Sequence, residues 1–158
     1  MDTSPRITVD DDITLITLQN CPAELSFVAE VFQKISQLGI DVDMISLAPS
    51  QSSTTSISFT VSDYDLDKLL NFTSELHNKT KIKAIVSSGN CKISIYDKNM
   101  KNSPGIAAQV FAAASRAESD IRIITTSEVD ISILVTAADF PETLKALKEK
   151  FHQTSETE

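Results

Sequence analysis

The sequence contains few of the residues on which phosphate and metal chemistry usually depend. Its 158 residues include three glycines, two histidines and two cysteines, and tryptophan is absent. A phosphate-binding loop needs several closely spaced glycines, so ATP chemistry in this chain is not expected. No CxxC or HExxH spacing occurs, and these are common patterns of metal ligands. We therefore predict no metal site and no cofactor.

Basic residues and long apolar runs are also scarce. The 14 Lys and Arg residues stand against 22 Asp and Glu residues, which gives a net charge of -8. Such a charge repels the phosphates of nucleic acids and anionic lipids. There is no leader peptide pattern, and no apolar run reaches the roughly eighteen residues that cross a membrane. Because Cys21 and Cys91 lie in unlike contexts, we expect a soluble, cytoplasmic protein with reduced thiols, whose partners are small zwitterions or proteins.

The sequence does contain an internal repeat. Residues 29–46 align with residues 108–125 without a gap at an offset of 79. Identical residues occur at Ala29/Ala108, Val31/Val110, Phe32/Phe111, Ser36/Ser115, Asp41/Asp120 and Ile45/Ile124. This repeat indicates one fold used twice, in units near the lower size limit for an independent core. We expect the units to support each other, with Phe32 and Phe111 in their cores.

Both repeat units show the same order of predicted elements. In the first unit, the patterns predict strands at 13–17, 40–44, 57–61 and 83–87, and helices over 27–38 and 66–76. In the second unit, they predict strands at 93–95, 121–123 and 131–135, and helices over 106–117 and 139–151. Asp139 is the expected N-cap of the last helix, with Pro141 in its first turn. The small side chains of the 106–117 helix indicate a close approach to its neighbours.

The first unit has the strand-helix-strand-strand-helix-strand order of a ferredoxin-like fold, whereas the second unit lacks the closing strand. A spare strand-like segment lies at 6–9, and we infer that residues 7–9 complete the second sheet; the alternative is a disordered leader. The predicted class is α+β, with two ferredoxin-like domains in tandem and the first inserted into the second. The predicted boundaries are 12–88 for the first domain, 5–10 plus 90–152 for the second, and 153–158 for a polar tail.

Two motifs in the second unit carry a family resemblance. The segment IITTSEVDIS at 123–132, together with NSPGIAA at 102–108, resembles the regulatory tail of aspartate kinases, which consists of paired ACT domains. The first unit, with FVAEVF at 27–32 and VDMI at 42–45, is similar to the effector-binding ACT domain of lysine-inhibited aspartate kinases. Nothing matches the catalytic domain of that family. The resemblance therefore implies a regulatory region that is not an enzyme by itself, with no catalytic residue.

The resemblance also implies effector contacts in the loop before the first helix of a unit and at the start of the next strand. Such a loop presents the unpaired N–H groups of the helix start, which suit a carboxylate. In the first unit, the implied effector-binding residues are Cys21, Glu24, Ser26, Phe27, Val42 and Asp43. The second candidate effector site consists of Asn102, Pro104, Gly105, Ile106, Ile121 and Thr125.

Asp43 is the residue best suited to hold the ammonium group of an amino acid. By strand alternation, Val42 and Met44 face the core, while Asp41 and Asp43 share the other face, near the loop's end of the sheet. A carboxylate at this position can pair with an ammonium group. The alternatives are a solvated strand charge or a cross-strand partner for Arg122, which stands at the equivalent position of the second unit.

The two loops differ in ways that favour the first unit. The second has Pro104-Gly105, in which proline suits the first turn of a helix and glycine allows a ligand to approach closely. The first has Leu25-Ser26, so either its pocket is narrower or the Ser26 hydroxyl itself binds the ligand carboxylate. Arg122 would repel a cationic ligand. We therefore expect the first unit to bind lysine, with threonine as second choice, and the second unit to support it.

The leading hypothesis is an allosteric module that binds a free amino acid and signals to a catalytic aspartate kinase domain or subunit. The alternative is an ACT-type module without a ligand that serves only for dimerisation, and the resemblance implies a homodimer in either case. An RNA-binding module would need aromatic and basic residues on the sheet, where Ser58, Ser94 and Ser132 stand instead. The initial methionine and the polar tail favour a free-standing subunit over an excised kinase segment.

Overall fold

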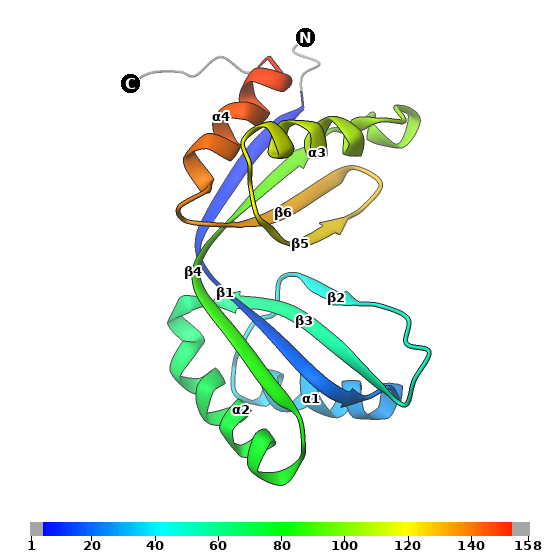
Figure 1. Ribbon diagram of the computed structural model, residues 1–158, viewed down its shortest axis with the longest axis vertical. Coiled ribbons are helices and arrows are strands. Elements are labelled where there is room, and N and C mark those ends of the chain that lie inside the picture. Colours follow the sequence, from blue (N-terminus) through cyan, green and yellow to red (C-terminus); the bar gives the residue numbers. More distant parts are fainter. Residues whose placement is uncertain (1–4, 153–158) are drawn as a thin grey trace. The chain divides into compact units, whose positions relative to one another are not determined.

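The computed structural model describes residues 5–152, and the chain folds into two compact units (Figure 1). The inserted unit consists of Asp12–Gly89. The discontinuous unit consists, within the described residues, of 5–11 and 90–152. The predicted polar tail at 153–158 lies outside the described residues. The α+β class is confirmed, with one ferredoxin-like domain inserted into the other.

The inserted unit is a four-stranded antiparallel arrangement with two helices. Its sheet has the order β2-β3-β1-β4. Its elements are β1 (Arg6–Pro22), α1 (Leu25–Gln37), β2 (Ile45–Leu47), β3 (Thr54–Ser62), the 3-10 helix η1 (Asp63–Asp65), α2 (Leu66–Lys79) and β4 (Lys83–Tyr96). The strands β1 and β4 are long because each runs on from one unit into the other.

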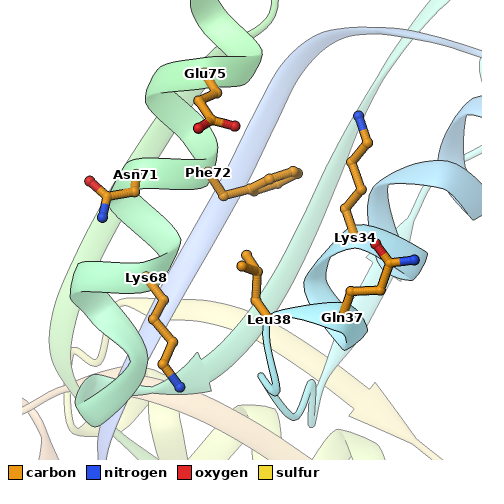
Figure 2. Close-up of a pocket in the computed structure, with 7 residues that line it drawn as sticks. All are labelled: Lys34, Gln37, Leu38, Lys68, Asn71, Phe72 and Glu75. Carbon is orange, nitrogen blue, oxygen red and sulfur yellow. The ribbon is translucent and has the colours of Figure 1, made fainter.

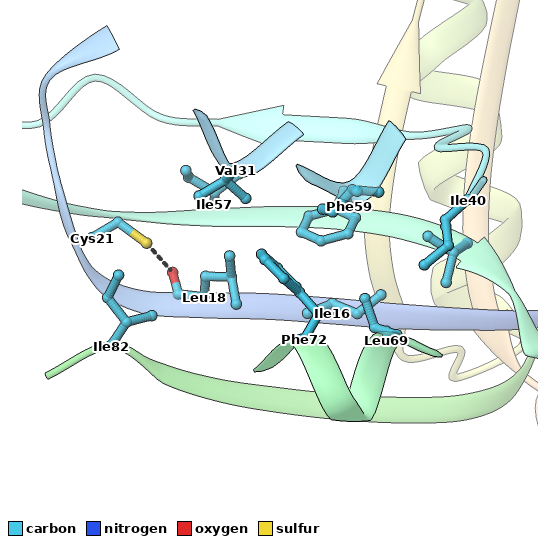
Figure 3. Close-up of a cluster of buried hydrophobic side chains, with 12 residues drawn as sticks. Ile16, Leu18, Cys21, Val31, Ile40, Ile57, Phe59, Leu69, Phe72 and Ile82 are labelled. Atoms are coloured by element: carbon cyan, nitrogen blue, oxygen red, sulfur yellow. Dashed lines mark hydrogen bonds between the residues drawn. The ribbon is translucent and has the colours of Figure 1, made fainter. Parts of the chain in front are cut away.

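The core of the inserted unit lies between its sheet and its two helices (Figure 3). Helical periodicity directs Val31 and Ile35 of α1 and Leu69 and Phe72 of α2 toward the sheet. The sheet side of this cluster consists of Ile16, Leu18, Ile57 and Phe59. Within the predicted strand at 13–17, Ile16 is the residue that joins this cluster. Successive strand residues point to opposite faces of the sheet, so Ile16 and Leu18 share the face that meets the helices.

The discontinuous unit repeats this architecture with a strand from the start of the chain. Its remaining elements are η2 (Met100–Asn102), α3 (Ile106–Arg116), β5 (Ile121–Thr126), β6 (Asp130–Thr136) and α4 (Phe140–Lys150). Its sheet order is β5-β6-β4-β1. Ile7 packs against the core of this unit, and the Arg6 guanidinium lies 5.2 Å from the centroid of the Tyr96 ring. The segment at 7–9 therefore belongs to the second sheet, as its alternation predicts.

Two details of the prediction are wrong, and a third is confirmed with a difference. The second strand begins at Ile45 rather than at residue 40. The segment at 41–44 has no regular strand structure. It still contacts β3 through the Asp43 N–H, which donates to the Thr60 carbonyl (3.1 Å). Phe111 was expected in the core but is 43% exposed. Phe32 does pack against its core, where its ring meets the Phe59 ring edge-to-face with the two ring centroids 5.2 Å apart. The expected N-cap Asp139 of α4 is confirmed, although its carboxylate accepts from the Asp120 N–H (3.0 Å) and makes no capping hydrogen bond to the helix.

Candidate functional site

The loop that precedes α1 in the inserted unit is shorter than the sequence predicts. The strand β1 continues to Pro22, so only Ala23 and Glu24 separate it from the helix. Glu24 is the N-cap residue, its side chain makes no capping hydrogen bond, and its carbonyl accepts from the Phe27 N–H (3.1 Å). The Phe27 N–H is therefore already used, whereas the Leu25 and Ser26 N–H groups, which open the helix, have no hydrogen-bond partner among the described residues. They lie at the positive end of the helix dipole. This helix start can therefore receive a carboxylate.

Half of the six effector candidates in the inserted unit point into the protein. The Cys21 thiol is buried in the core and lies 3.6 Å from the Leu18 carbonyl (Figure 3), and this burial raises the pKa of the thiol. Phe27 and Val42 are half-buried and pack against the same core. These three side chains stabilise the unit, and any contact of Cys21 with a ligand would have to come from its backbone.

The other three candidates, Glu24, Ser26 and Asp43, are exposed. Their positions on the sheet show that they form two separate groups. Cys21 is opposite Thr55 of β3, whereas the Asp43 N–H donates to the Thr60 carbonyl. Five residues of an antiparallel strand span roughly 17 Å. The prediction that Asp43 lies near the loop's end of the sheet is therefore wrong: β2 runs parallel to β1, so its start lies at the other end.

A cavity of about 320 Å³ lies beside this loop in the inserted unit. It is lined by Ala23, Leu47, Ala48, Pro49, Ser50 and Thr55. The turn that forms its wall is held by hydrogen bonds from the Ser50 and Ser52 hydroxyls to the Thr54 carbonyl. Sequence reasoning did not include these residues, although the proline and serines of the turn were a visible signal. The lining contains no charged side chain, so a cationic ligand would need a carboxylate from elsewhere.

The sheet edge next to this cavity is apolar. β2 is the edge strand of the inserted unit, and both Ile45 (51%) and Leu47 (47%) are substantially exposed. Leu25, at the start of α1, is 76% exposed. An edge strand has unpaired backbone N–H and C=O groups that can bind another strand. This edge therefore combines backbone hydrogen-bonding capacity with exposed apolar side chains.

The candidate residues of the discontinuous unit surround a different helix start. Pro104 and Gly105 form a turn before α3 rather than its first turn, and Gly105 is the N-cap with a φ of +101°, which favours glycine. Asn102 lies in η2 and is exposed. Ile106 and Ile121 are half-buried and pack against the core, and Thr125 is half-buried in β5.

The loop before α3 is tied to the β5–β6 turn. The Asp97 N–H donates to the Val129 carbonyl (2.9 Å), and the Lys101 ammonium lies 3.0 Å from a Glu128 carboxylate oxygen. Arg122 forms an ion pair with Asp120 of its own unit (2.9 Å). The charge that we expected to repel a cationic ligand from this unit is thus partly offset by a neighbouring carboxylate.

Within residues 5–152, no group of three or more His, Cys, Asp or Glu side chains is arranged to hold a metal ion. None of the helices in this described part is long and apolar enough to cross a membrane.

Comparisons with known proteins agree with this geometry. Residues 93–151 match the family model of the ACT domain. An aspartokinase from Bacillus sp. (strain MGA3) is 27% identical over 146 residues, which cover 92% of this chain and 36% of that protein. The chain thus spans about a third of the length of the curated relatives that it matches.

Solved structures give the same result. The regulatory subunit of aspartate kinase from Thermus thermophilus superposes with a TM-score of 0.86 at 27% identity, covering 95% of this chain and 99% of that subunit. Aspartokinase III of E. coli, in complex with lysine and aspartate, shares the fold with a TM-score of 0.72 at 22% identity, covering 96% of this chain and 34% of that one. Residues 93–151 form an ACT domain, and the chain as a whole is homologous to the tandem ACT regulatory region of aspartate kinases.

Proposed function

We propose that this chain is a non-catalytic, cytoplasmic amino-acid sensor that binds lysine in preference to threonine. It would pass the signal to a catalytic aspartate kinase domain or subunit by favouring one of two arrangements of packed domains. The observation that carries this proposal is the inserted unit's edge, where a free helix start, an uncharged cavity and an exposed apolar strand lie together. The homology to aspartate kinase regulatory subunits supports it.

The separation of the candidate residues supports a site that is completed by a second copy of the chain. In one chain, the helix start and Asp43 lie at opposite ends of the sheet. Two β2 edges that pair antiparallel about a twofold axis place the start of one strand beside the end of the other. Asp43 of the partner subunit then lies near the helix start and the cavity. The proposed active form is therefore a homodimer through β2.

This arrangement fits the chemistry of lysine. The ligand carboxylate binds at the N–H groups that open α1, where the helix dipole favours an anion. The ammonium group of the ligand needs a carboxylate. Asp43 is exposed, and the Asp43 in question belongs to the second copy of the chain, whose β2 start lies beside the site in the proposed dimer. The lysine complex of E. coli aspartokinase III supports lysine as effector class for this fold. Threonine is the second choice because it has no side-chain cation.

Calorimetric titration with lysine, threonine and methionine tests this proposal. We expect saturable binding of lysine, which Asp43→Ala weakens by about tenfold, because it removes a charged partner of the ligand. Asp41→Ala is the matched control, since Asp41 is another exposed carboxylate two residues earlier. Equal affinity of the two variants would contradict the assigned role of Asp43.

A dimerisation module without a ligand is the second candidate function. It is favoured by the inward orientation of Cys21, Phe27 and Val42, which leaves few side chains for an effector. In that case none of the three amino acids binds at millimolar concentration, while sedimentation still shows a dimer. We expect Leu47→Lys to dissociate this dimer, because it places like charges on both exposed edges.

A further inference from the structure

The helical side of the inserted unit contains a cavity that belongs to neither effector site. It has a volume of about 300 Å³ and lies between the end of α1 and residues 68–75 of α2. Lys34 and Leu38 line it from the α1 side, and Lys68, Phe72 and Glu75 line it from α2 (Figure 2). Gln37 and Asn71 complete the lining, with their amides directed away from Leu38 and Phe72 (Figure 2). The four α2 residues follow the spacing of one helix face.

Side-chain size explains why this cavity is open. The positions equivalent to Lys34 and Leu38, at the offset of 79, are alanines in the discontinuous unit. The turn between β5 and β6 is shorter than the turn between β2 and β3, so after it the offset between the units is 74. The position equivalent to Phe72 is also alanine. The residues concerned are Ala113, Ala117 and Ala146, and there α3 packs directly against α4. The cavity is thus a feature of the inserted unit that its repeat partner does not share.

The cavity lining contains two lysines, Lys34 and Lys68, and one carboxylate, Glu75, so its formal charge is +1 and it favours an anion. Among the residues that the structure describes, Lys34 has no ion-pair partner. Lys68 forms an ion pair with Asp65 at 3.9 Å, and its side chain is 55% exposed, so that pair is weak. Two such lysines are notable in a chain with a net charge of -8. Both ammonium groups are therefore available to a ligand.

The shape of the cavity specifies where the charges of a ligand would lie. Figure 2 shows the ammonium groups of Lys34 and Lys68 at opposite ends, with Leu38 and Phe72 between them. Phe72 is buried, and Leu38 is fixed as the C-cap of α1 by the left-handed Gly39 that follows it. The Glu75 carboxylate lies across the Phe72 ring from the Lys34 ammonium group, so the Lys34 end is less positive than the Lys68 end. The apolar floor between the two lysines is complementary to an elongated molecule with an anion at each end.

We propose that this cavity binds an organic dicarboxylate with an apolar centre. One carboxylate pairs with Lys34 and the other with Lys68, while the centre of the molecule packs on Leu38 and Phe72. Because such a ligand bridges α1 and α2 in the folded state only, its binding stabilises the inserted unit.

Amide NMR spectra of the chain, titrated with adipate, test this proposal. We expect saturable shifts confined to residues 34–38 and 68–75, weaker shifts with hexanoate, and none there with hexanediol or diaminohexane. Shifts of equal size with diaminohexane, or none from adipate in these segments, would overturn the assignment. Titration with lysine or threonine is expected to shift the amides of the loop before α1 and of β2 instead. The two sets of shifts therefore distinguish failure of this site from failure of the proposed function.

Substitutions identify the groups involved. We expect Lys34→Ala and Lys68→Ala each to weaken adipate binding roughly threefold, the effect of one exposed ion pair. Lys34→Arg, which keeps the charge, retains most of the affinity. Lys145→Ala is the control, because Lys145 is an exposed lysine on the α4 helix of the other unit. If all of these variants bind adipate equally, the contact is a non-specific surface effect and the proposal is wrong.

Discussion

In the inserted unit a cavity lies between α1 and α2, whereas in the discontinuous unit α3 packs directly on α4. The strands and their order correspond, so the difference resides in the helix faces. Larger side chains at three equivalent positions hold one pair of helices open, and alanines allow the other pair to close. A duplicated fold can thus retain its architecture while a few substitutions create a binding surface in one copy. The following substitutions test this comparison.

The largest effect is expected from exchanging lysine and alanine at one pair of equivalent positions. Ala113 of α3 is fully buried in the core of its unit, whereas Lys34 of α1 is exposed. We predict that Ala113→Lys lowers the free energy of unfolding by about 3–5 kcal/mol, because it buries an unpaired charge in a packed site. Lys34→Ala should change it by less than about 0.5 kcal/mol. Urea denaturation measures both, and a mild effect of Ala113→Lys would show that α3 and α4 can separate.

An intermediate effect is expected at the two phenylalanines of the repeat. Phe32 packs edge-to-face with Phe59, while Phe111 is 43% exposed. We predict that Phe32→Ala costs about 2–3 kcal/mol of stability, through a lost aromatic contact and a cavity. Phe111→Ala should cost less than about 1 kcal/mol. Thermal unfolding of the two variants compares them, and equal costs would mean that Phe111 is covered in solution, for instance by a second chain.

The smallest effect concerns the residue after the first helix of each unit. Gly39 and Glu118 are equivalent, and both have left-handed backbones, with φ values of +72° and +54°. In each case the next residue donates back into the helix, Ile40 to Ile35 and Ser119 to Ala114. Glycine adopts this conformation without a Cβ clash.

We therefore predict that Glu118→Gly stabilises the chain by about 0.5–1 kcal/mol and that Gly39→Ala destabilises it by about 1 kcal/mol. Chemical denaturation at neutral pH resolves differences of this size. A destabilising Glu118→Gly would indicate that the Glu118 side chain makes a contact that outweighs the backbone strain.

The arrangement of the elements could be predicted because it depends on local patterns. Helical periodicity in α1 and α3, and alternation in β3 and β6, are readable without knowing the neighbours. The missing closing strand of the second unit pointed to the segment at 7–9, which does lie beside the second core through Ile7. Each of these inferences needs only the period of a short segment and the requirement that a sheet be complete.

The site was predicted less well because its geometry depends on register. Alternation placed Asp43 on the solvent side, and it is exposed. Its distance from the helix start, however, follows from the pairing of β1 and β2 with β3, which no single segment encodes. The cavity beside the Ser50 turn and the cavity between α1 and α2 were missed for the same reason: both arise between segments.

The sequence by itself determined that one fold is used twice, where its helices lie and that the first unit is inserted into the second, because periodicity and repetition are properties of neighbouring residues. Only the tertiary structure decided that Cys21 faces the core, that Asp43 and the helix start lie apart, and that α1 and α2 leave room for a ligand. These features depend on strand register and on the distance between helices, which packing sets through residues distant in the chain.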